Sequence, residues 1–104
     1  MSEGYTINNA EQRALIEAII KEIDELLALR QGFNEAYRDW KEGALERLRQ
    51  SMGEAFANEV DRKGPRQTPI NRQHRVHIYR QRLHAQQRFL QELLEQGTVQ
   101  SEAN

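Results

Sequence analysis

The chain has 104 residues, and 15 lysines and arginines against 16 acids give a formal net charge of −1 at pH 7. This length fits one domain, and an apolar share of 38% allows only a modest core. The lack of cysteine excludes disulfides and thiolate chemistry. No apolar run reaches the roughly 18 residues that would span a membrane. The start MSEGYTINNA lacks the pattern of a secretory signal, so we expect a cytoplasmic protein without a membrane partner.

One long helix is predicted over residues 9–61, after a mobile tail of residues 1–8. Asn8 followed by Glu11 fits a capped helix start. Apolar residues then recur with heptad spacing in two series, which only Arg30 interrupts. The series are Ile16, Ile23, Arg30, Tyr37 and Ala44, and Ile19, Leu26, Phe33 and Trp40. This coiled-coil-like pattern is typical of a helix that packs along a seam with another helix.

A second helix is predicted over residues 69–96, after a loop of residues 62–68. The sequence Lys63-Gly64-Pro65 ends the first helix, because proline cannot continue the ladder of hydrogen bonds. Thr68 and Pro69 fit the cap and first turn of the next helix, and Gly97 fits its end. Residues 97–104 would form a mobile tail. The short loop predicts an all-α helical hairpin with antiparallel helices.

The hairpin leaves part of the first helix uncovered. At 1.5 Å per residue the two helices would measure about 80 and 42 Å, so the apolar stripe near residues 15–29 would face water. Pairing with another copy would cover it, and a homo-oligomer is therefore expected. The predicted oligomer seam consists of Ile16, Ile19, Ile20, Ile23, Leu26 and Leu27. An alternative keeps this stripe inside one chain: a turn at Gly32 would give a three-helix bundle.

Positive charge is concentrated in the second half of the chain. Residues 62–91 contain eight lysines and arginines and no acid, and arginine outnumbers lysine 12 to 3 in the whole chain. On a helical wheel the second helix has three faces. Its core stripe contains Val76, Tyr79, Leu83, Leu90 and Leu94, with Leu93 beside them. A minor apolar stripe contains Ile78, Ala85 and Phe89, and can be either a second interface or scattered exposed residues.

The third face and the loop before it predict a binding surface. Arginine, glutamine and histidine can donate to phosphate oxygens, and arginine and glutamine can also read base edges. The candidate residues for nucleic acid, or for an acidic partner, are Arg62, Lys63, Arg66, Arg72, Arg75, His77, Arg80, Gln81, His84 and Arg88. The same charges could instead pair within the protein. The acids available for that on the first helix are Glu35, Asp39, Glu42, Glu46, Glu54 and Glu59.

Neither catalysis nor a metal site is predicted. The chain lacks a phosphate-binding glycine loop and a nucleophile elbow, so we expect a non-enzyme without a cofactor. His74 and His77 could reach one ion, but no acid between residues 62 and 91 completes a site. Phe33, Tyr37 and Trp40 could stack bases, although core packing explains their seam positions better.

Three hypotheses for the function follow. The first is a small oligomeric helical protein that binds nucleic acid through its Arg-rich loop and second helix. The second is a protein–protein adaptor or inhibitor whose basic face docks on an acidic surface of a larger complex. The third is a structural coiled-coil subunit whose positive helix is neutralised within the protein.

Overall fold

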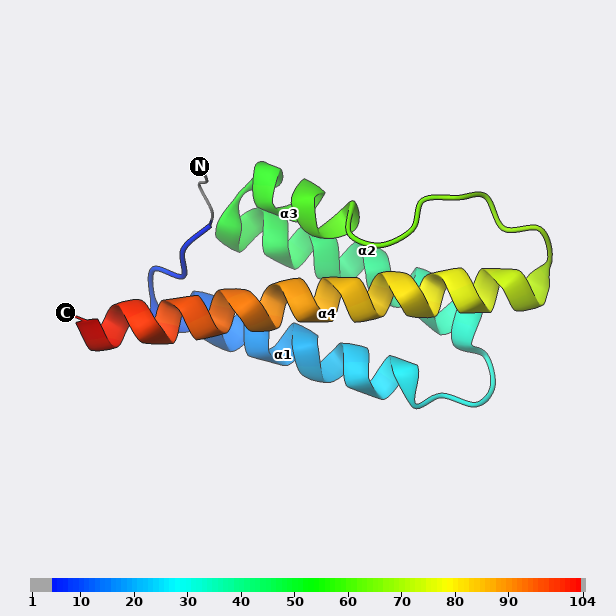
Figure 1. Cartoon of the computed structure of the whole chain (residues 1–104), viewed down its shortest axis with the longest axis horizontal. Coiled ribbons are helices and arrows are strands. Elements are labelled where there is room, and N and C mark those ends of the chain that lie inside the picture. The colour runs from blue at the N-terminus through cyan, green and yellow to red at the C-terminus, as the bar shows by residue number, and fades with distance from the viewer. Residues whose placement is uncertain (1–4, 104) are drawn as a thin grey trace.

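The computed structural model describes the backbone of residues 5–103 and the side chains of residues 5–96. This part of the chain forms four helices: α1 (Ala10–Leu27), α2 (Phe33–Met52), α3 (Glu54–Asp61) and α4 (Arg72–Ala103). The all-α prediction is confirmed. The long α4 runs antiparallel to α1 and packs against both α1 and α2, which also contact each other, while α3 packs mainly on α2 (Figure 1). The molecule measures 49 × 26 × 22 Å.

The expected continuous helix over residues 9–61 is wrong. The chain leaves the helix after Leu27 and turns back at Gly32, where φ is 67°. Glycine adopts this left-handed conformation without the Cβ clash of other residues, so the alternative with a turn at Gly32 describes this region correctly. A second break falls at Gly53, between α2 and α3, and the sequence did not indicate it.

Asparagine side chains cap the starts of α1 and α4. Asn9 caps α1 by accepting from the Gln12 N–H at 2.8 Å, and the Gln12 side chain accepts from the Asn8 N–H at 2.7 Å. The predicted start near Asn8 or Asn9 is confirmed, with Gln12 rather than Glu11 as the partner. The start of α4 was predicted too early. Asn71, and not Thr68, accepts from an N–H of the first turn, that of His74, at 2.8 Å.

Some residues of the two expected tails are packed or helical. Residues 1–4 and 104 lie outside the described residues. Tyr5 packs its ring edge-on against Phe56, with 5.0 Å between the ring centroids. The helical backbone of α4 continues past Gly97 to Ala103, so the predicted end of the second helix at Gly97 is wrong. The mobility expected for residues 97–104 stays a prediction. A glycine inside a helix costs only about 1 kcal/mol, which is too little to end α4 by itself.

One core joins all four helices. Its buried residues are Ile16, Ile19, Ile23, Leu26, Phe33, Tyr37, Ala44, Leu48, Phe56, Ala57, Val60, Leu83, Leu90 and Leu93. Both heptad series therefore contribute to an intramolecular core. The rings of Tyr37 and Tyr79 stack between α2 and α4 with centroids 4.4 Å apart. The interpretation of Phe33, Tyr37 and Trp40 as core residues is confirmed, because the first two are buried and the third packs against them.

The predicted oligomer seam packs within the chain. Ile16, Ile19, Ile23 and Leu26 are buried by the other helices, and Ile20 and Leu27 pack against the same core. An uncovered apolar stripe was the reason to expect an oligomer. That stripe is covered here, so this reason no longer applies.

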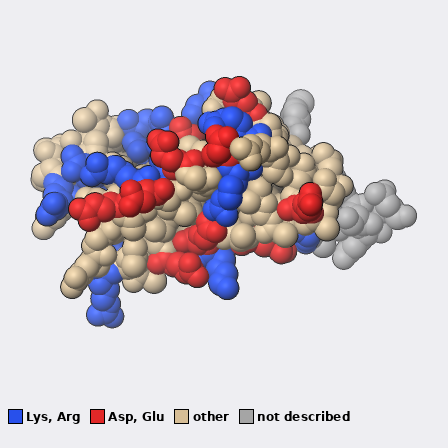
Figure 2. Space-filling view, turned by 180° about the vertical axis from the view of Figure 1, so that it is seen from behind, with Lys and Arg blue, Asp and Glu red and all other residues tan. Residues whose placement is uncertain are grey.

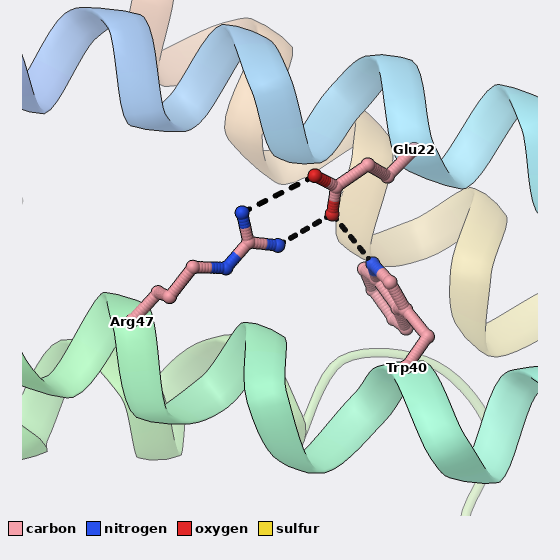
Figure 3. Close-up of polar contacts among 3 residues, drawn as sticks. All are labelled: Glu22, Trp40 and Arg47. Carbon is pink, nitrogen blue, oxygen red and sulfur yellow. Dashed lines mark hydrogen bonds and ion pairs between the residues drawn. The ribbon is translucent and has the colours of Figure 1, made fainter.

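A polar contact fixes α1 against α2. Arg47 donates to both carboxylate oxygens of Glu22, and the Trp40 indole N–H donates to one of them at 2.8 Å (Figure 3). Burial alone would raise the pKa of Glu22, but the hydrogen bonds from Arg47 and Trp40, with the charge of Arg47, lower it below its usual value.

Candidate functional site

The loop between α3 and α4 lies tightly against α4. The Arg82 Nε donates to the Pro65 carbonyl at 2.8 Å, and His74 Nδ1 accepts from the Ile70 N–H at 3.0 Å. A Cβ placed on Gly64 would lie 2.7 Å from the Cα of Arg82. This close approach fixes the loop, and with it the basic side chains that the loop carries.

The minor apolar stripe of α4 faces inward. Ile78 is fully buried, and Phe89 packs against Phe56 of α3 with ring centroids 5.8 Å apart. The Lys63 ammonium lies 4.5 Å from the centre of the Phe89 ring. The interpretation of these residues as scattered exposed side chains is therefore wrong, because α3 and the start of the loop cover this flank of the helix.

Four of the predicted site residues have partners in the protein. Arg62 and Lys63 both pair with Glu59, at 3.2 and 3.0 Å. The hydrogen bond and charge of Lys63, helped by Arg62, lower the pKa of the Glu59 carboxyl. Arg66 donates to the Asp61 carbonyl at 2.7 Å. The fourth residue, Arg80, reaches across to the end of α1.

Arg80 closes the C-terminal end of α1. Its guanidinium donates to the carbonyls of Leu27 and Leu29, at 2.8 and 3.1 Å, and lies 4.8 Å from the centre of the Phe33 ring. The carbonyls at a helix end lack partners within the helix and attract positive charge. Arg80 therefore has a structural role, and it is half-buried rather than free on the surface.

The other predicted residues of α4 form an open polar face. His77, Gln81, His84 and Arg88 are exposed at helical spacing, and we call these four residues the α4 stripe. Neither their side chains nor those of Arg72 and Arg75 make a hydrogen bond or ion pair with any residue that the structure describes. Six of the ten predicted residues thus remain available to a ligand.

The acids of the first three helices do not neutralise α4. Within the described part of the chain, the cross-helix ion pairs are Arg47 with Glu22 and Lys41 with Asp61. The other pairs join neighbours in sequence. Figure 2 shows lysine and arginine side chains gathered toward the end that carries the turn at Gly32 and the start of α4. Internal neutralisation, which the structural-subunit hypothesis requires, is absent from the described arginines of α4.

A cleft of about 300 Å³ opens at this end of the molecule. It lies between the turn that joins α1 to α2 and the first turns of α4. Its charged lining consists of Arg30, Arg72, Arg80 and Glu35. The sequence indicated Arg72 and Arg80 as binding residues. The sequence showed Arg30 only as the residue that interrupts the heptad pattern. It could not show that Arg30 lies near the start of α4.

The histidines do not gather into a metal site. His74 is engaged with the loop, because Gln67 lies 3.2 Å from its Nε2 and its Nδ1 accepts from Ile70. Among the residues that the structure describes, no three histidine or acidic side chains lie close enough to bind one ion. None of the helices described combines the length and hydrophobicity needed to cross a bilayer.

Comparisons of this chain with protein-family models, curated proteins and solved structures find no match.

Proposed function

We propose that this protein binds nucleic acid through the α4 stripe together with Arg72, Arg75 and the basic loop. One observation carries the proposal: the described arginines of α4 make no ion pair within the protein, although the first three helices are rich in acids. An arginine without an internal partner can exchange its hydration for a phosphate oxygen. Nucleic-acid affinity comes largely from such contacts, because they release counterions from the backbone.

The dimensions of the stripe suit a nucleic-acid backbone. His77 and Arg88 are eleven positions apart, which corresponds to about 17 Å along a helix. Phosphates of one strand of duplex DNA follow one another about every 3.4 Å along the axis, so the stripe spans about five of them. Gln81 and Arg88 add side chains that can also read base edges.

Fluorescence anisotropy with a labelled duplex and a labelled single strand, at several salt concentrations, tests the proposal. We expect affinity to fall steeply as salt rises. Arg88→Gln should weaken binding and reduce the slope of log K against log salt by about 0.9, the change for one lost phosphate contact on duplex DNA. Arg49→Gln is a matched control, because it removes the same charge from an exposed arginine of α2 that pairs with Glu46.

The proposal predicts that Arg49→Gln leaves the slope unchanged. Absence of binding at low salt, or an equal effect of both substitutions, would contradict it. Equal effects would mean that only the net charge matters and that the α4 stripe is not the contact surface.

An acidic protein surface is the second candidate ligand, and one observation favours it. Ile70 is 83% exposed in the loop, between Arg66 and Arg72. A large apolar side chain surrounded by arginines is typical of an anchor at a protein–protein interface. Ile70→Ser should leave binding to nucleic acid unchanged if phosphates are the ligand, whereas an adaptor would lose capture of its acidic partner.

A further inference from the structure

The cleft at the end of α4 carries an excess of positive charge. Arg30, Arg72 and Arg80 contribute three charges and Glu35 removes one, which leaves two. Arg80 is fixed by its two bonds to α1 carbonyls, and a guanidinium with five N–H donors still has three to offer. Arg30 and Arg72 are exposed and make no contact with other described residues. One fixed and two adjustable guanidiniums therefore line the same cleft.

Apolar side chains share the lining with these arginines. Leu29, Phe33 and Val76 line the cleft, and Leu29 keeps 36% of its surface exposed. In the described part of the chain only Ile70 and Leu29 are large exposed apolar residues. A volume of about 300 Å³ lies at the lower end of the range for small-molecule sites. The cleft can thus accept an organic group next to its arginines.

Acceptor oxygens complete the lining. Glu35 and Asn34 belong to the first turn of α2, and both line the cleft. The Asn34 Oδ1 is buried and has no hydrogen-bond partner among the described residues. The exposed carboxylate of Glu35 can accept a hydrogen bond from a ligand donor, such as a sugar hydroxyl.

We propose that this cleft binds a nucleoside monophosphate, either free or as the terminal nucleotide of a strand. A phosphate monoester carries a charge of about −1.5 to −2 at pH 7, which matches the net charge of the lining. A carboxylate would neutralise only half of it. Arginine suits phosphate because two of its N–H groups can donate in parallel. The base and sugar would lie against Leu29 and Val76, near the exposed Glu35 carboxylate.

The site is separate from the α4 stripe. The stripe runs along the exposed face of α4, whereas the cleft uses Arg72, Val76 and Arg80 from the flank that faces the turn at Gly32. Nucleotide binding in the cleft and strand binding by the stripe can therefore be tested separately.

Isothermal titration with adenosine 5′-monophosphate, adenosine and inorganic phosphate tests the assignment on the unmodified protein. We expect the nucleotide to bind at least about tenfold more tightly than either fragment, because only the nucleotide can contact both the arginines and the apolar side chains of the cleft. The proposal is wrong if adenosine or inorganic phosphate binds as tightly as the nucleotide. It is also wrong if the nucleotide does not bind.

Variants then locate the site. Arg30→Gln and Arg72→Gln should each weaken nucleotide binding about tenfold, since each removes a charge-assisted contact. Neither side chain makes a hydrogen bond, ion pair or ring contact with other described residues, so both variants should fold. Circular dichroism checks that they do. Arg88→Gln is the matched control outside the cleft and should bind the nucleotide normally. Unchanged affinity in both cleft variants would overturn the assignment.

Oligonucleotides with and without a 5′-phosphate identify the source of the ligand. A 5′-phosphorylated strand that binds more tightly than the same strand without the phosphate, with a gain that Arg30→Gln removes, would identify a strand end. Equal affinity would identify a free nucleotide, and both results support the cleft. If Arg88→Gln weakens strand binding but no nucleotide binds, this inference is wrong while the proposed function stands. If the nucleotide binds but no strand binds, the proposed function is wrong while this inference stands.

Discussion

Glu22 shows how one residue couples the helices. Its carboxylate is about one-third exposed, yet it accepts from Arg47 and Trp40 of α2. The sequence placed Glu22 on α1 but could not identify these partners, because the turn at Gly32 decides which face of α2 meets α1. The same is true of Arg80: its wheel position suggested a surface ligand residue, whereas the fold places it at the end of α1.

Glu22→Gln tests this coupling. We expect a loss of about 1 kcal/mol in the free energy of unfolding, a reduced value for a charged hydrogen-bond network that is partly open to solvent. Urea denaturation measures the change. Glu46→Gln is the matched control, because Glu46 pairs with Arg49 on the surface of a single helix and should cost less than about 0.5 kcal/mol. Equal losses would show that the Glu22 network adds no cross-helix stability.

The pH dependence of stability gives an independent check. The pKa of Glu22 is lowered in the folded protein, so its contribution is complete above about pH 4.5, its value without these contacts. The contribution is lost as the pH falls below that value through the folded pKa. Between pH 7 and pH 3, the stability difference between the unmodified protein and Glu22→Gln should shrink. A constant difference would contradict this role.

At the scale of the elements, composition and spacing predicted helices well and breaks less well. The heptad series correctly predicted helices, and Gly64 and Pro65 correctly predicted a helix end before them. The break at Gly53 was not, because Leu48, Met52 and Phe56 continue at helical spacing across it. The start of α4 was misplaced by three residues, because Thr68 and Pro69 resemble a cap locally while the loop extends along α4 to Asn71.

Gly64→Ala tests the packing of the loop on α4. The new methyl would meet the Arg82 backbone, and φ is 88° at this position. We expect a loss of about 1–3 kcal/mol in the free energy of unfolding, measured by thermal denaturation. Gly43→Ala is the control: nothing lies within 4 Å of its Cβ, and it should stabilise α2 by about 0.5–1 kcal/mol. A neutral Gly64→Ala would mean that the loop is not packed as described.

At the scale of the whole molecule, the fold depends on apolar residues first assigned to an oligomer seam. Ile19 is 1% exposed inside the core. Ile19→Ala should cost about 2–4 kcal/mol, because it leaves a cavity in a packed interior. Because the packing is intramolecular, the resulting shift in Tm should be the same at low and high protein concentration. A shift that grows on dilution would instead place Ile19 between subunits.

The charge distribution has a consequence for the whole molecule as well. Acids of the first three helices pair with arginines and lysines of those same helices and of the loop, and the described arginines of α4 remain without ion pairs. Sequence alone led to external binding as the first hypothesis but left internal pairing open, because it does not show which faces meet. The arrangement of the helices favours external binding.

Mapping of amide shifts by NMR, as a short duplex is added at low salt, tests the central claim most directly. We predict shifts at the α4 stripe, at Arg72 and Arg75 and in the basic loop, with the exposed face of α1 unaffected. Shifts confined to that face of α1, or no shifts at low salt, would contradict the account.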